Sequence, residues 1–376
     1  MLKDHMRPSF YLLLFLCTIT VTLHAQNENT PFLNIGDPAP PLRVRKWFKG
    51  LPVQQFEKGK IYVVEFWATW CRPCLASMPH LSTLAREYKD HVTFIAIDVM
   101  ENKTTTLENI KAVVERMGSR MDFPVATEDS NLMATGWIEA SAHEGIPATF
   151  VVNAEGKLAW FGHPKDLPAV LPNIVNNTWN IKEASSRLNE NRRLRDLDRE
   201  VPSLLMEYKV DQFKPGSVTK PDSILFAINE MVRKEPKLKY APFIAYDNFR
   251  FLLMTDPDKA YAYGKEVLVN PTYQEPAYNA IIGNIAWYSD KMKIPGKIYE
   301  LGAEACQLEI DHVVYPELVN LPEMYSKMAD MYWRSNNKIK AIEAQQKAID
   351  AMKVKQALEM TELETKFQQY KDMKTF

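Results

Sequence analysis

Cysteine is scarce in this sequence, which has four among 376 residues. Disulfides therefore do not hold the fold together. Excess charge of one sign is lacking too: 46 basic and 47 acidic residues give a formal net charge of -1, which argues against nucleic acid or an anionic membrane as the principal partner. Beyond the N-terminus, no apolar run approaches the length of a membrane span. With 46% hydrophobic residues, the chain is globular and long enough for two domains.

Two of the four cysteines form a Cys-x-x-Cys motif, Cys71-Arg72-Pro73-Cys74, separated by three residues from the apolar run 63–67. The run predicts a buried strand, and the motif predicts a dithiol where that strand ends and a helix begins. Free backbone N–H groups and the helix dipole stabilise an anion at a helix N-terminus. The thiol of Cys71 should therefore ionise readily and act as the nucleophile, with Cys74 one turn later.

Other uses of such a pair fit the sequence less well. A structural zinc site needs four ligands, whereas the remaining cysteines, Cys17 and Cys306, each stand alone. Covalent haem attachment needs a histidine after the second cysteine, and Leu75 stands there. A purely structural disulfide is uncommon across so short a loop. Thiol-disulfide exchange is the favoured chemistry, and no metal site is predicted.

Three stretches together resemble a known family: Gly36-Asp37-Pro38-Ala39-Pro40, the motif region 66–74, and the segment 145–153 that begins Gly145-Ile146-Pro147. They are similar to the thioredoxin superfamily, and within it to the exported TlpA/ResA-like thiol-disulfide oxidoreductases of bacteria. The resemblance covers about residues 34 to 170. It implies an α/β thioredoxin fold, with a central mixed sheet flanked by helices.

The resemblance also implies roles for individual residues. Cys71 matches the attacking cysteine, Cys74 the resolving cysteine, and Trp70 the aromatic residue that flanks them. Pro147 matches the cis-proline that lies against the dithiol, and the backbone at Ile146 matches the edge on which a substrate peptide pairs.

Glu65 lies where thioredoxins place a buried acid that helps to deprotonate the resolving cysteine. It stands between Val64 and Phe66 in the apolar run, and a central parallel strand is covered on both faces. Desolvation there favours the neutral carboxyl, which suits a proton acceptor; the alternative is a carboxylate at the strand end that reaches solvent. Many TlpA/ResA-like proteins have an acid three positions after the second cysteine, where this chain has Ser77.

The N-terminus predicts export. Lys3 and Arg7 precede an apolar stretch from Phe10 to Cys17, and small or polar residues lead to a cleavage site after Ala25. Residues 1–25 are thus expected to be a cleaved signal peptide and the mature protein to be periplasmic. An uncleaved membrane anchor and a lipid-modified Cys17 are the weaker alternatives, because the apolar core is short and Leu16 is large for a lipoprotein signal.

Between the motif and Pro147, the pattern predicts a strand at 93–99 and a helix with its capping box at Thr105 and Glu108, closed by Gly118. A short strand is expected at 123–126. These elements complete a thioredoxin-like domain at 26–180.

A second domain is predicted at 181–376. The charge-rich stretch 182–200 reads as an exposed helix or a linker, and helical periodicity with prolines at the expected boundaries follows it. Small and aromatic residues near the C-terminus approach tetratricopeptide spacing: Tyr325, Met328, Ala329, Tyr332, Ala341 and Ala348. Gln345 and Lys353 break that pattern, so a repeat array and a plain helical bundle fit equally well. Either would offer a surface for a partner protein or for a second copy of the chain.

The sequence thus predicts an exported thiol-disulfide oxidoreductase that acts on disulfides of protein substrates. No nicotinamide or flavin motif is present and no cofactor is expected, so electrons must come from another thiol protein; the resemblance implies a membrane electron carrier, with reduction as the direction. Two alternatives remain. A helical binding module could carry a redox-sensing dithiol, or the chain could be a thiol peroxidase, although Ala68 and Val64 stand where a peroxiredoxin has Thr and Pro.

Overall fold

The computed structural model describes residues 32–209, 220–273, 276–313 and 319–372. The predicted signal peptide at 1–25 and Cys17 lie outside these residues. Residues 32–175 contain six strands and three α-helices, namely β1 (Val44–Lys49), β2 (Ile61–Trp67), α1 (Arg72–Glu87), β3 (Val92–Asp98), α2 (Leu107–Met117), β4 (Val125–Glu128), β5 (Ala148–Val152), β6 (Leu158–Gly162) and α3 (Leu167–Val175). A short π-helix, η2 (Ala134–Glu139), precedes β5.

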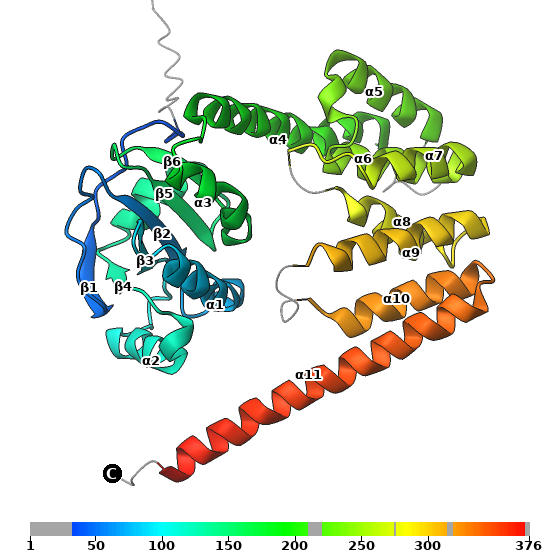
Figure 1. The fold of residues 1–376 in the computed structure, drawn as a ribbon. Helices are drawn as coiled ribbons and strands as arrows, with labels where there is room; N and C mark the ends of the chain where they lie inside the picture. Colours follow the sequence, from blue (N-terminus) through cyan, green and yellow to red (C-terminus); the bar gives the residue numbers. More distant parts are fainter. Residues whose placement is uncertain (1–31, 210–219, 274–275, 314–318, 373–376) are drawn as a thin grey trace, which may run out of the picture. The chain divides into compact units, whose positions relative to one another are not determined.

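The six strands form one mixed sheet in the order β1-β4-β3-β2-β5-β6 (Figure 1). β2, β3 and β4 run parallel, while β1, β5 and β6 are antiparallel to their neighbours. β2 is therefore central, with β3 on one side and β5 on the other. The predicted mixed sheet with flanking helices is confirmed.

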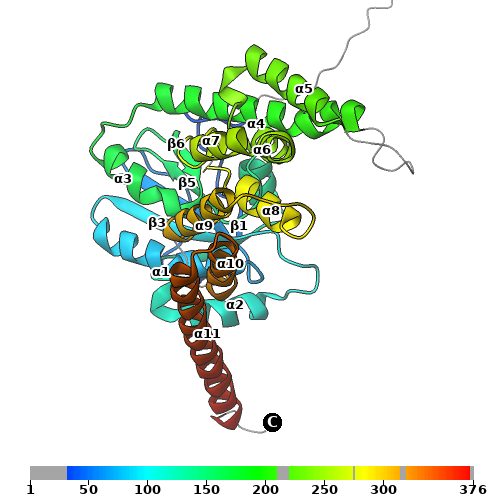
Figure 2. The same ribbon diagram turned by 90° about the vertical axis from the view of Figure 1, so that its right-hand side faces the viewer.

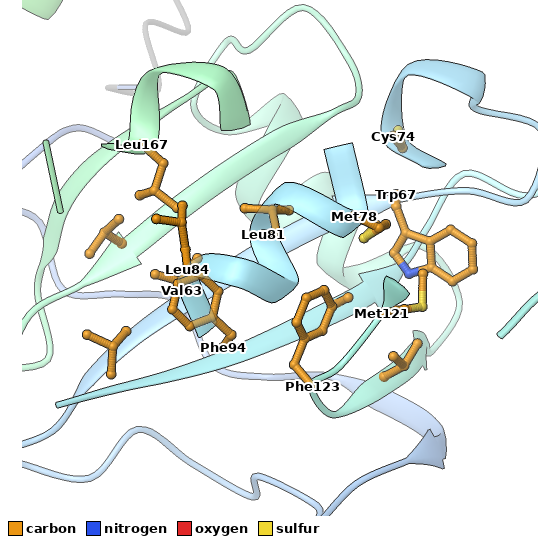
Figure 3. Close-up of a cluster of buried hydrophobic side chains, with 14 of the residues drawn as sticks. Val63, Trp67, Cys74, Met78, Leu81, Leu84, Phe94, Met121, Phe123 and Leu167 are labelled. Atoms are coloured by element: carbon orange, nitrogen blue, oxygen red, sulfur yellow. The ribbon is translucent and has the colours of Figure 1, made fainter. Parts of the chain in front are cut away.

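Residues of β2 alternate between the two faces of the sheet, and each face has its own core. Val63 and Trp67 pack against the helices α1, α2 and α3 on one face. Figure 3 shows the Trp67 indole on this face beside Met78 and Met121. Val64 and Phe66 point to the other face, where η2, the segment that precedes β1 and the start of the helix after α3 cover the sheet. A strand buried on both faces explains the continuous apolar run 63–67.

Two local predictions need correction. The capping box of α2 is formed by Thr106 and Asn109, one residue later than the predicted pair: Thr106 Oγ1 accepts from the Asn109 N–H, and Asn109 Oδ1 accepts from the Thr106 N–H. An amide oxygen can fill the role that the motif assigns to Glu or Gln. The strand predicted at 123–126 begins instead at Val125, directly after Pro124. The strand predicted at 93–99 is present as β3, shifted by one residue.

The charge-rich stretch lies in one long helix, α4 (Ile181–Lys209), and it is not simply exposed. Its first half packs Ala184 and Leu188 into the core on the second face of the sheet. Its second half buries Leu194, Val201 and Leu205 against the helices that follow. The predicted boundary between domains, at residues 180 and 181, remains a prediction, because α4 contributes to both cores.

The rest of the described chain is helical, as predicted. The helices are α5 (Pro221–Lys234), α6 (Pro242–Thr255), α7 (Pro257–Val267), α8 (Tyr278–Tyr288), α9 (Gly296–Asp311), α10 (Leu321–Arg334) and α11 (Lys338–Asp372), and α8 to α11 follow one another in a stack (Figure 2). Pro242, Pro257 and Pro322 stand in the first turns of their helices, and Pro295 caps α9. The tetratricopeptide character remains a prediction. No helix in the described residues is long and apolar enough to cross a membrane.

Candidate active site

The two motif cysteines form a disulfide at the start of α1, with 5.3 Å between their Cα atoms. Cys71 is the N-cap residue, and its Sγ accepts a hydrogen bond from the backbone N–H of Cys74 at 3.2 Å. Pro73 occupies the first turn, where its missing N–H leaves no helix hydrogen bond unmade. The sulfur of Cys71 thus lies at the positive end of the helix dipole, where a thiolate is stabilised.

The Ile146–Pro147 peptide bond is cis, as the resemblance implied. Phe66 pairs with Ala148, so Pro147 lies beside the end of β2. This strand ends at Trp67, four residues before Cys71. The Ile146 side chain is partly buried and packs against the core cluster that contains both cysteines. The structure therefore brings Pro147 and Ile146 to the same end of the sheet as Cys71 and Cys74.

Glu65 is 1% exposed. Its side chain lies on the same face of β2 as Val63 and Trp67, the face that α1 and its cysteines cover. The hydroxyl of Thr149, the residue opposite on β5, donates to Glu65 Oε2. Oε1 has no hydrogen-bond partner within the described residues. Burial raises the pKa of this carboxyl to about 8, against the opposing effect of the Thr149 hydrogen bond. That pKa lies close to the ordinary thiol pKa of about 8.5, so a proton can pass between a thiol and this carboxyl at small free-energy cost.

Stability should reveal this raised pKa. The folded protein holds the Glu65 proton up to a pKa of about 8, whereas the unfolded chain releases it near 4.5. Between these values the native state binds more protons, so the stability contributed by Glu65 falls as pH rises, by about 1.4 kcal/mol per pH unit. Glu65→Gln cannot ionise. We expect the unfolding free energy of the variant, relative to wild type, to increase steadily from pH 5 to pH 8. Denaturant titrations across that range measure it, and a constant difference would contradict the assignment.

Residues of the loop after β3 form hydrogen bonds with Thr69 and Trp70, the two residues that precede Cys71. Glu101 accepts from the Thr69 N–H at 2.5 Å and from the Thr69 hydroxyl at 2.9 Å. The indole N–H of Trp70 donates to the Met100 carbonyl at 3.0 Å, while its ring stays 49% exposed. These bonds fix the two residues before Cys71, and they leave the Trp70 ring available as a surface beside the disulfide.

Two further carboxyls lie near this loop. Asp98, at the end of β3, is fully buried and accepts from the Thr127 hydroxyl at 2.8 Å. Burial, together with nearby Glu101 and Glu128, raises the pKa of Asp98 to about 9. Glu128 accepts backbone N–H bonds from Met100, Met133 and Ala134. Asp98 thus remains protonated at neutral pH, and Glu128 ties the loop to η2.

Four other residues that the sequence drew attention to have structural contacts: Ser77, His143, His163 and Cys306. Ser77 is buried in α1 and donates to the Cys74 carbonyl at 2.7 Å. His143 shares a hydrogen bond with the Gly145 carbonyl, and His163 accepts from the Lys165 N–H. Cys306 is buried in α9, and burial raises the pKa of its thiol to about 12, which makes it a packing residue. Within the described chain, no group of three or more His, Cys, Asp or Glu side chains is arranged for a metal.

The sequence reasoning missed Thr149, Thr69 and Glu101. Thr149 reaches the site through the pairing of β5 with β2, and Glu101 reaches it from the loop after β3. Neither arrangement leaves a pattern in the local sequence. Asp98 did leave a local pattern, because it is the only charged residue of β3.

The chain is similar in sequence to several known proteins. The sequence profile of the thioredoxin family matches residues 51–114. Protein FixW of Rhizobium leguminosarum is 30% identical over 212 residues, which are 52% of this chain and 96% of that protein. The chain belongs to the thioredoxin family.

This thioredoxin-family protein also resembles the thiol-disulfide oxidoreductase ResA of Bacillus subtilis, with 28% identity over 102 residues, or 27% of this chain and 51% of ResA. The chain thus spans about half the length of that relative. Among solved structures, a thiol-disulfide isomerase from Corynebacterium glutamicum is 19% identical, with 38% of this chain and 96% of that chain covered and a TM-score of 0.32. The sequence relatives, together with the Cys71–Cys74 pair, make the thioredoxin-fold part a thiol-disulfide oxidoreductase domain of the ResA type.

Proposed function

We propose that this protein is exported and reduces disulfides of protein substrates in the periplasm. The observation that carries the proposal is the Cys71–Cys74 disulfide at the N-terminus of α1, at the same end of the sheet as cis-Pro147. The buried Glu65 lies on the same face of the sheet as α1. The N-terminal pattern of residues 1–25 supports export.

The reaction is a two-step exchange that moves two electrons. The Cys71 thiolate attacks one sulfur of the substrate disulfide, which breaks that bond, forms a mixed disulfide and releases one substrate thiolate. Cys74 then attacks the Cys71 sulfur as a thiolate, so that the internal disulfide forms and the second substrate thiolate leaves. We infer that Glu65 takes the proton of Cys74 in the second step, because both groups are buried on the same face of the sheet. The ionised form of Glu65 does this, and it is the minor form below the pKa of about 8. Each departing substrate thiolate gains a proton and becomes a thiol.

The cycle needs a reductant that returns two electrons to the Cys71–Cys74 disulfide. We propose another thiol protein or a membrane electron carrier of the periplasm for this step, since the dithiol can exchange with either. The helical part would select the substrate or bind a second copy, because several large apolar side chains on its helices are exposed, among them Trp287, Trp333 and Ile342.

The direction of electron flow is tested by the redox state of the protein in cells. Trapping thiols with acid and alkylating them should find the Cys71–Cys74 pair mostly reduced, as a reductase requires, and the mature chain should begin at Gln26. A pair that is mostly oxidised would make the protein an oxidant or a sensor. Peroxide turnover by the purified reduced protein at the rate of disulfide turnover would favour the thiol peroxidase alternative.

A further inference from the structure

Three arginines of α4 lie along one face of the helix, because Arg192, Arg195 and Arg199 are spaced three and four residues apart. All three meet the loop between η2 and β5. Arg192 Nη2 donates to the Ser141 carbonyl, and also to the Leu33 carbonyl at 3.0 Å. Arg195 and Arg199 both pair with the Glu144 carboxylate, Arg195 at 3.4 Å.

This loop ends in the cis peptide. Glu144 stands three residues before Pro147, and Gly145 between them has a φ of +105°, a conformation that favours glycine. Ser141 is 1% exposed. A loop held at Ser141 and Glu144 has little freedom at Ile146, whose backbone is the proposed peptide-binding edge.

Other side chains in the same turns of α4 hold the helical part. Leu194 and Val201 are buried against α5 and α6. The Asp198 carboxylate accepts the backbone N–H groups of Phe243 at 3.0 Å and Ile244 at 3.2 Å, at the start of α6. The stretch 192–201 therefore contacts both the loop before Pro147 and the helices α5 and α6.

The two kinds of contact with the loop differ in strength. The side chains of Glu144 and Arg199 are 57% and 51% exposed, and such surface pairs contribute little. Arg192 is partly buried, its guanidinium lies 5.7 Å from the Phe161 ring centroid, and it satisfies two carbonyls. Charge-assisted hydrogen bonds of that kind are the stronger ones. Arg192 is therefore a stronger contact between α4 and the loop than the pair of Arg199 with Glu144.

We propose that Arg192 is a positioning residue for peptide binding: it holds the loop that carries cis-Pro147, and so makes the substrate edge of the thioredoxin-fold part depend on α4. The inference rests on the proposed function in one respect, since it takes the Ile146 backbone as the edge on which the substrate peptide pairs. A small disulfide needs no such edge.

The test compares wild type with Arg192→Met, which keeps an unbranched apolar side chain and removes the guanidinium. We expect the amides of residues 142–145 to exchange hydrogen about tenfold faster, because one charge-assisted contact that held the loop is lost. KM for a peptide disulfide should rise about tenfold, with kcat for that peptide and turnover of a small aromatic disulfide unchanged. Arg192→Lys, which retains a charged donor, should recover part of the loss.

The matched control is Arg187→Met on the same helix, whose guanidinium lies 6.0 Å from the Trp179 ring centroid; it should change none of these quantities. Faster loop exchange with an unchanged KM would overturn the proposal, as would equal losses for the peptide and the small disulfide. Failure of the proposed function would look different: wild type would reduce the small disulfide but not the peptide. Amide exchange in Arg192→Met would then still decide whether Arg192 holds the loop.

Discussion

Cys71→Ser should reduce disulfide turnover to the uncatalysed background, while Cys74→Ser should accumulate mixed disulfides with its substrates. The reason is the division of labour at the start of α1. Cys71 is the N-cap residue with its sulfur at the helix dipole, and Cys74 is fully buried behind it. Without Cys71 there is no nucleophile for the first step; without Cys74 the first step proceeds and the second cannot. Mass spectrometry of the non-reduced adducts, with turnover of a peptide disulfide, measures both.

Cys306→Ser is the matched control, since this thiol is buried and its pKa is raised to about 12; it should leave turnover unchanged. Alkylation of the reduced protein at graded pH should also show Cys71 reacting below the ordinary thiol pKa of about 8.5. Stable adducts on Cys71→Ser instead of Cys74→Ser would reverse the assigned roles.

Shortening the chain after Asn180 should destabilise the thioredoxin-fold part, by about 3 kcal/mol or more relative to a chain that ends after Lys209. The shorter chain loses the partly buried aliphatic side chains of Ile181 and Leu188, each contributing about 1 to 2 kcal/mol, and the two carbonyl bonds of Arg192. Such a loss is a large fraction of a typical domain stability of about 5–15 kcal/mol. Denaturant unfolding of both shortened chains gives the difference.

The longer chain exposes Leu194, Val201 and Leu205, which normally pack on α5 and α6. A version with Leu205→Gln controls for aggregation through that surface. Equal stability of the chains ending at 180 and 209 would show that the first half of α4 adds nothing to the fold of the thioredoxin part, and would make residue 180 a true domain boundary.

The redox motif could be predicted from sequence because its chemistry is local. An apolar strand followed by Cys-x-x-Cys specifies a dithiol at a helix start, and the structure places Cys71 at that position. The cis bond before Pro147 had a different origin: nothing in its spacing distinguishes it from any other proline, and only the resemblance to thioredoxins indicated it.

The rest of the site could not be predicted, because it depends on contacts between residues distant in the sequence. Thr149 reaches Glu65 across 84 residues through the pairing of β2 with β5. Arg192 reaches Ser141 from a helix that charge content alone marked as exposed. A helix with charged residues on one face and buried apolar residues on the other can have the same composition as a fully solvated helix. The composition of α4 therefore did not show that it packs against both the sheet and the helices α5 and α6.

The reduction potential of the Cys71–Cys74 pair tests the central claim most directly. Purified protein would be equilibrated with dithiol and disulfide buffers, and the oxidised fraction measured by alkylation. The account predicts a single two-electron transition, with a shift of about 30 mV for each tenfold change in the buffer ratio. The midpoint should be close to that of thioredoxin, about −270 mV, and more negative than that of disulfide isomerases, about −180 mV. A midpoint near the about −120 mV of strong oxidants would contradict a reductase, and no titration at all would contradict a redox-active dithiol.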